Sequence, residues 1–260
     1  MKDYLILFLF LCVLTSGCQS RPEAGDDLEA ARQAYVEHQY LEAERLYERY
    51  LKIHEKGAAR WEVWNRLYDL AYAVRGNESD ALELLEAMLL EYADKPEKVR
   101  SILYRMGDLA MQMRDMEKAV DAWQRILDMP ESTPLDQVTA YRNIGEAYIA
   151  TADYDLAIDA FRSCMEIPVE PVERAQCLYG LAQTQFFLEN YHPAVVSLTN
   201  VLETKGISQE LASIATLLLS DAYDQLGRIP EAITLLEGIA DTYPNPMVIE
   251  KRLEYLRKRM

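Results

Sequence analysis

The amino-acid sequence predicts an all-α fold: a solenoid of about six helix pairs, closed by one terminal helix. The first observation is an alanine that recurs 38, 38, 38, 37 and 38 residues apart, as Ala43, Ala81, Ala119, Ala157, Ala194 and Ala232. The second is that apolar residues around these alanines follow the period of a helix, and no segment alternates as a strand does. A fixed period of this length is typical of architectures in which each repeat packs on its neighbours.

Each repeat places residues of different size at fixed distances from the recurring alanine. Small residues predominate twelve positions before it, as at Gly107, Gly145 and Ala182. Large residues lie four positions after it, as at Trp123 and Phe161. Small side chains let two helices approach closely, and large ones fill the space between repeats, so this pattern predicts close helix packing.

Turn-forming sequences separate the predicted helices. They are Arg75-Gly76-Asn77, Arg114-Asp115, Ala152-Asp153, Glu189-Asn190 and Leu226-Gly227-Arg228. Thr133-Pro134 and Asn245-Pro246 have the residue types of an N-cap followed by proline at the first helical position. The second pair predicts a capping helix over 245–260, because a terminal repeat would otherwise expose its apolar face.

The pattern resembles the tetratricopeptide repeat over residues 24–244. The clearest unit has Tyr141, Ile144, Gly145 and Tyr148 in its first helix and then Ala157 and Phe161 in its second. The resemblance implies a right-handed superhelical solenoid over 27–244, in one all-α domain, with a concave groove that binds other proteins. The period of about 38 exceeds the usual 34 or so of this family, so we expect longer helices or longer joins.

In this family, side chains of the first helix of each pair line the concave groove. The equivalent positions here are Arg66, Tyr104, Asp108, Met111, Arg142, Asn143, Glu146, Tyr179, Gln183, Phe186, Asp221 and Asp224. Aromatic and arginine side chains are the usual anchors of interfaces. The alternative is that these residues are merely exposed, or fill the groove between neighbouring first helices. The carboxylate clamp of chaperone-binding members is matched only at Asn143.

The N-terminus has the pattern of an export signal. Lys2 precedes an unbroken apolar run from Leu5 to Leu14, shorter than the about 20 residues that span a bilayer. The segment from Leu14 to Cys18 resembles the lipobox of bacterial lipoproteins. That resemblance implies a signal peptide over 1–17 and acyl chains such as palmitate on Cys18.

A short tether over 18–26 would then join the lipid to the solenoid. Gln19, in place of aspartate, favours the outer membrane facing the periplasm, by resemblance to Gram-negative sorting rules. An ordinary secretory signal cut near Gly17 is the alternative, with Cys18 incidental.

Two further cysteines, Cys164 and Cys177, leave two possibilities open. An exported chain with an even pair of cysteines favours a disulfide. Alternatively, both are small core residues, because free cysteine is commonly buried. Cys164 ends one predicted helix and Cys177 begins the next, so a bond between them would join two repeats.

The charge of the chain is unevenly distributed. The formal net charge of −16 argues against nucleic acid, whose phosphates attract lysine and arginine. The last eleven residues are basic, with Lys251, Arg252, Arg257, Lys258 and Arg259 against Glu250 and Glu254. This basic end either contacts anionic lipid or an acidic partner, or is a polar cap whose cations suit a helix C-terminus.

Motifs for catalysis, metal binding or phosphate binding do not occur in the sequence. The three histidines, His38, His54 and His192, are scattered. We therefore expect no enzyme activity, no cofactor, no metal site and no small-molecule substrate.

The sequence thus predicts a lipid-anchored scaffold that binds protein partners in the bacterial cell envelope through the concave groove. Lipoproteins with such repeats work in outer-membrane protein assembly, as pilotins and in coordinating cell-wall synthesis, which are expectations from resemblance. Two alternatives stay open: a binding protein for a non-protein ligand such as a cell-wall glycan, and a self-assembling structural lipoprotein.

Overall fold

A computed structural model describes residues 24–260 of the 260-residue chain, so the signal peptide, Cys18 and most of the tether lie outside the described residues. Within this range all regular structure is helical. The elements are α1 (Ala24–Val36), α2 (Tyr40–Ile53), α3 (Arg60–Asp69), the π-helix η1 (Leu70–Val74), α4 (Glu78–Glu91), α5 (Pro96–Gln112), α6 (Met116–Leu127), α7 (Pro134–Ala150), α8 (Tyr154–Glu166), α9 (Pro171–Phe187), α10 (Tyr191–Glu203), α11 (Gln209–Gln225), α12 (Ile229–Ile239) and α13 (Pro246–Arg257). The all-α prediction and the order of the helix pairs are confirmed.

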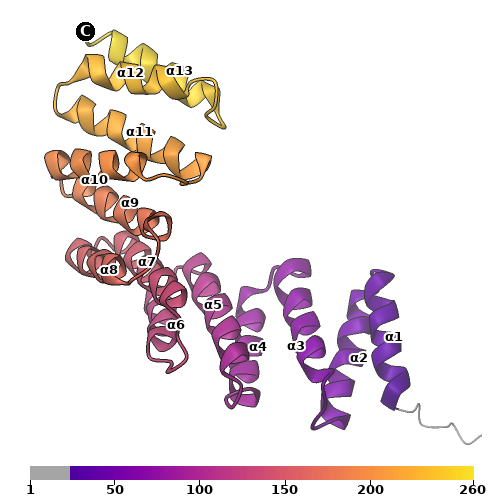
Figure 1. Cartoon of the computed structure of the whole chain (residues 1–260). Helices are drawn as coiled ribbons and strands as arrows, with labels where there is room; N and C mark the ends of the chain where they lie inside the picture. Colours follow the sequence, from indigo (N-terminus) through magenta and orange to yellow (C-terminus); the bar gives the residue numbers. More distant parts are fainter. Residues whose placement is uncertain (1–23) are drawn as a thin grey trace, which may run out of the picture. The chain divides into compact units, whose positions relative to one another are not determined.

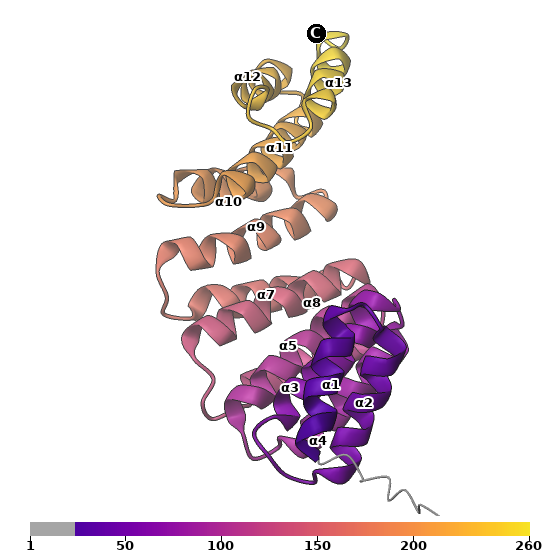
Figure 2. The same ribbon diagram turned by 90° about the vertical axis from the view of Figure 1, so that its right-hand side faces the viewer.

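The chain divides into two compact units, where the sequence analysis expected one domain. Unit 1 ends at Asn77 and contains α1, α2, α3 and η1, and unit 2 runs from Glu78 to Met260. The boundary therefore falls inside the second predicted repeat, between its two helices. Within unit 2 the helices follow one another in chain order from α4 to α13 (Figure 1). Figure 2 shows the α9–α10 pair between the α7–α8 pair and α11.

The predicted turns between paired helices are confirmed, and all but one share the same backbone hydrogen bond. A residue with positive φ ends the first helix of each pair: His38, Gly76, Arg114, Ala152, Glu189 and Gly227. The next backbone N–H then donates to a carbonyl five residues earlier, as from Asp153 to Tyr148 at 2.9 Å. This is the hydrogen bond of a Schellman C-cap, which satisfies a carbonyl that the helix end would leave free. At the second turn the bond spans six residues, from Asn77 to Ala71, next to the π-helix η1.

The predicted size pattern explains how the repeats of unit 2 pack. Phe161 of α8 is fully buried and lies against glycines of two different repeats. A Cβ added at Gly145 of α7 would come within 2.6 Å of this ring, and one at Gly180 of α9 would overlap it as well. Trp123 of α6 has the same relation to Gly107 of α5. Because no side chain fits at these glycines, each large ring sets the spacing of the helices around it.

Helix starts follow the sequence signals in part. Thr133 accepts from the backbone N–H of Asp136 and its own backbone N–H donates to that carboxylate, so α7 begins with a capping box. Asn245 occupies the N-cap position of α13 but makes no capping hydrogen bond with its side chain. The first helix begins at Ala24, inside the segment 18–26 that the sequence analysis expected to be a tether.

Between residues 24 and 260, no helix combines the length and the apolar character that crossing a membrane requires. The same part of the chain contains no group of three or more His, Cys, Asp and Glu side chains placed to hold a metal ion.

Candidate functional site

The candidate site is the inner face of unit 2, formed by the first helices of successive repeats. There α7 packs on α9 and α9 packs on α11, while the second helices α8 and α10 fill the spaces behind them. We call the side chains that α5, α7, α9 and α11 present on this side the A-helix face. Most of the predicted groove residues belong to these four helices.

Tyr104 of α5 joins the first two helices of the A-helix face. Its hydroxyl lies 3.2 Å from the Oδ1 carboxylate oxygen of Asp136 at the start of α7, where Arg100 also lies 3.3 Å from Oδ2. Burial, together with the neighbouring Asp136 charge, raises the pKa of Tyr104 to about 12. Burial alone would raise the pKa of Asp136, but hydrogen bonds from Thr133 and the charge of Arg100 lower it overall. Tyr104 is therefore a neutral hydrogen-bond donor that fixes α5 against α7.

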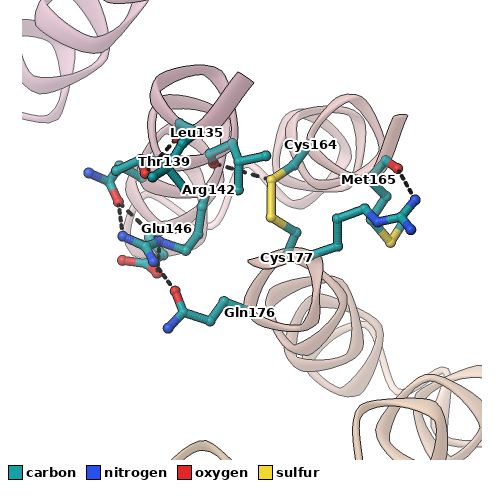
Figure 3. The surroundings of a disulfide bond; sticks show 11 residues. Leu135, Thr139, Arg142, Glu146, Cys164, Met165, Gln176 and Cys177 are labelled. Carbon is teal, nitrogen blue, oxygen red and sulfur yellow. Dashed lines mark hydrogen bonds and ion pairs between the residues drawn. A yellow bond between two sulfur atoms is a disulfide. The ribbon is translucent and has the colours of Figure 1, made fainter. Parts of the chain in front are cut away.

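Arg142 of α7 is the centre of a polar cluster. Its guanidinium donates to Gln176 of α9 and, at 3.1 Å, to the side-chain oxygen of Asn143, and it lies 3.7 Å from the carboxylate of Glu146. In Figure 3, Arg142 and Gln176 point toward each other on one side of α9, while the adjacent Cys177 points to Cys164. The cluster thus connects two successive repeats through side chains of the A-helix face.

A pocket of about 280 Å³ lies beside this cluster and spans three first helices. Its lining residues are Arg142 and Glu146 of α7, Gln176 and Tyr179 of α9, and Ser208, Glu210, Leu211 and Ile214 at the start of α11. Tyr179, Leu211 and Ile214 provide apolar surface, and the remaining residues provide charge and hydrogen-bonding groups. Such a combination of apolar surface and a few polar groups is typical of binding sites.

Two carboxylates of the A-helix face lie in an unfavourable environment although solvent reaches both. Burial raises the pKa of Asp108 above its ordinary range, and the charge of Arg142 opposes this only in part. Burial also raises the pKa of Glu146, with Arg142 lowering it and Asp108 raising it further. Burial, and then Tyr243 and Glu146, also raise the pKa of Tyr179, which lines the pocket together with Glu146.

Asp221 and Asp224 of α11 do not line an open groove, contrary to the sequence analysis. Asp221 forms an ion pair with Arg252, and Asp224, only 6 % exposed, forms one with Arg259. Both arginines belong to the C-terminal segment that includes α13, which covers this end of the face. The basic end of the chain is therefore largely engaged within the protein, as the capping interpretation expected, and we exclude these two aspartates from the candidate site.

The remaining predicted groove residues differ in their surroundings. Met111, Asn143 and Gln183 are half-buried on the A-helix face. Phe186 lies edge-on to Tyr191 at 5.3 Å, so it packs against the turn of its own helix pair. Arg66 belongs to unit 1, where its guanidinium lies 4.7 Å from the centre of the Tyr35 ring and 3.7 Å from Asp69. Arg66 is therefore not part of the unit 2 site described here.

Sequence reasoning missed the α11 side of the pocket. It predicted residues from the middle to the end of the first helices and overlooked Ser208, Leu211 and Ile214, which lie at the start of α11. The spacing of Leu211, Ile214 and Leu218 at three and four residues marks one helical face and was the available signal.

A disulfide connects two of the three repeats that carry the pocket. Cys164 of α8 and Cys177 of α9 are bonded, with Cα atoms 6.1 Å apart, a usual separation for this bond. Both residues are fully buried in a cluster that includes Phe161, Val138 and Leu181. The bond therefore fixes the start of α9, and with it Gln176, against the preceding repeat.

The fold and site define a helical repeat protein, and comparison with known proteins identifies the repeat. Residues 98–168 and 215–246 match models of the tetratricopeptide repeat family. Both segments lie in unit 2 and contain the predicted third, fourth and sixth repeats in large part. These two segments of the chain therefore match the tetratricopeptide repeat, in agreement with the resemblance.

Curated relatives and solved structures agree with this. The chain is 27 % identical over 198 residues to Superkiller complex protein 3 from Homo sapiens and 26 % identical to the Mus musculus protein, but these residues make up only 12 % of each relative. A tetratricopeptide repeat protein from Parabacteroides merdae superposes with a TM-score of 0.62 at 14 % identity, covering 90 % of this chain and 87 % of that one. The type IV pilus biogenesis factor PilW superposes with a TM-score of 0.59 at 16 % identity, covering 88 % and 98 %. Likeness at these identities shows the fold alone.

Proposed function

We propose that this protein is a non-enzymatic scaffold that binds a protein partner along the A-helix face of unit 2. The observation that carries this proposal is the pocket across α7, α9 and α11, where apolar side chains lie beside Arg142 and Glu146. Tetratricopeptide repeats typically form such scaffolds, and aromatic and arginine side chains are the common anchors of protein interfaces. Ion pairs, caps and the disulfide hold the helices in place, so little conformational entropy is lost when a partner binds.

We further propose that the scaffold is held at a membrane of the bacterial cell envelope by a lipid on Cys18, facing the periplasm from the outer membrane. This rests on the lipobox resemblance of the segment ending at Cys18 and on Gln19. The disulfide between Cys164 and Cys177 supports export, because such bonds persist mainly in oxidising compartments. Stable anchoring requires two or more acyl chains, which lipoprotein maturation would supply.

In-cell photo-crosslinking tests the binding surface. A benzophenone amino acid at Gln183, half-buried on the A-helix face, should capture one dominant envelope protein. The same residue at Asp159, on the outer helix α8, is the matched control and should not. Equal capture at both positions, or none at Gln183, would contradict the proposed surface. An adduct of twice the chain mass would indicate self-assembly, and a thermal shift with cell-wall glycan fragments would indicate the glycan alternative.

Fractionation tests the anchor separately. Cys18→Ala should remain unlipidated and leave the membrane fraction after a salt wash. If the variant still sediments with membranes, the lipid is not what holds the protein there.

A further inference from the structure

Three carboxylates of unit 2 occupy the same position in their repeats. Asp108, Glu146 and Asp221 each lie eleven residues before the recurring alanine, in α5, α7 and α11. All three have a pKa that burial raises above its ordinary range. The repeat therefore places an acidic group on the A-helix face in three of its units.

At α11, the C-terminal segment of the chain covers the carboxylate at this position. Arg252 of α13 pairs with Asp221, and Arg259, just beyond that helix, pairs with the nearby Asp224. The same segment buries Ile249, Leu253 and Leu256 in a core with α12. A segment with arginines next to apolar side chains is thus the natural complement of this position.

At α5 and α7 no equivalent segment is present in the described chain. Arg142 is the one cation whose charge acts on both Asp108 and Glu146, and its guanidinium already contacts Gln176 and Asn143. Glu210 adds a third carboxylate on the pocket rim. Three carboxylates therefore face one arginine, which leaves this part of the face negative and accessible.

We infer that the A-helix face at α5, α7, α9 and the start of α11 receives a basic segment of the protein partner, with a lysine or arginine at Asp108 and Glu146 and an adjacent apolar side chain in the pocket. This rests on the proposed scaffold function and specifies its partner. Tyr179, Leu211 and Ile214 provide the apolar contact for this side chain. They correspond to the core that buries the apolar side chains of α13 against α12. Buried ion pairs at an interface favour the correct partner because a wrong charge is strongly disfavoured.

Peptide selection on the full-length chain tests this inference. Random twelve-residue peptides displayed on phage are selected against the immobilised chain, and the most enriched peptide is synthesised for fluorescence anisotropy. We expect enriched sequences to place lysine or arginine next to an apolar residue. Asp108→Asn/Glu146→Gln should weaken the peptide's binding about tenfold or more, since close charge pairs at an interface can contribute strongly to affinity.

The matched control removes two carboxylates from outer helices of the same unit. Asp159→Asn/Glu203→Gln changes the charge equally and should alter the affinity by less than about twofold, because screening weakens distant charges. Thermal unfolding confirms that each variant is folded. Enrichment of acidic or uncharged peptides, no enrichment, or equal losses in both variants would overturn the inference. Such a result leaves the crosslinking test at Gln183 unaffected, so the two proposals fail independently.

Discussion

The two ends of the A-helix face in unit 2 use the same acidic position in opposite ways. At α11, Asp221 and Asp224 are covered by the chain's own C-terminal segment and each has an arginine partner. At α5 and α7, Asp108 and Glu146 remain accessible and share one arginine with polar neighbours. At the α11 end, arginines of the same chain neutralise the carboxylates. At the α5–α7 end, the folded protein retains negative charge that its own cations do not fully neutralise.

This difference separates a structural role from a binding role. Asp224 is buried, and a buried carboxylate without its cation is destabilising. Asp108 and Glu146 are exposed, so a cation of a partner can reach them. The α11 end has the internal partner, and we propose that the α5–α7 end has the external one. Four measurements test this contrast, from the largest expected effect to the smallest.

Removing apolar contact under α13 should have the largest effect. Ile249 is fully buried in the core that α13 shares with α12, so Ile249→Ala should lower the free energy of unfolding by about 2–5 kcal/mol. Urea denaturation measures this. The exposed Met247→Ala on the same helix is the control and should change stability by less than about 0.5 kcal/mol. Equal losses in the two variants would mean that the cap is not held by this core.

The disulfide between α8 and α9 should stabilise unit 2 by a comparable amount. Cys164→Ala/Cys177→Ala should cost about 2–4 kcal/mol, because the bond restricts the unfolded chain. Peptide mapping without reduction should recover the two cysteines in one linked product. Two alkylated thiols at these positions in the untreated protein would show instead that both cysteines are simply small core residues.

Breaking the arginine pairing at the covered end should cost less. Arg259→Gln leaves Asp224, which is 6 % exposed, without its cation, and a loss of about 1–3 kcal/mol is expected. Adding Asp224→Asn should recover part of that loss, because a neutral amide tolerates burial better than a carboxylate. If the double variant is no more stable than Arg259→Gln, the aspartate charge is not what Arg259 compensates.

The smallest effect on stability, and one of opposite sign, should come from Asp108 and Glu146 at the α5–α7 end. The pKa of both Asp108 and Glu146 is raised in the folded protein, so each ionised carboxylate opposes folding at neutral pH. Asp108→Asn/Glu146→Gln should therefore leave stability unchanged or increase it by less than about 1 kcal/mol, since solvent screens both groups. The gain should disappear as pH falls below the ordinary carboxyl pKa of about 4. A clear loss of stability at pH 7 would show that these carboxylates are structural.

Sequence reasoning predicted the fold well because its signals are local and repeated. The turns at Arg114, Ala152 and Glu189 were located from residue type and period, and the structure gives all three positive φ. Thr133 was predicted as an N-cap from Thr133-Pro134, and the structure shows it in a capping box with Asp136. These features depend on neighbours in the sequence, which a pattern records directly.

The site was predicted less completely because it depends on contacts between distant residues. Asp224 and Arg259 are 35 residues apart, and no period indicates which cation reaches which aspartate. The division of the second repeat between two units was missed for the same reason, since packing between helices decides it. The prediction that Phe186 faces the groove overlooked Tyr191, which stands only five residues further along the chain.

The position of Phe161 limits how this protein can be shortened. One ring fills the space left by Gly145 in its own repeat and by Gly180 in the next, and the disulfide joins the same two repeats. Neither repeat is a self-contained module, because removing one leaves the other with an empty hollow or an exposed ring. A minimal binding fragment would therefore have to keep α7 to α10 intact, and exchange of single repeats with other solenoids should fail at this junction before it fails elsewhere.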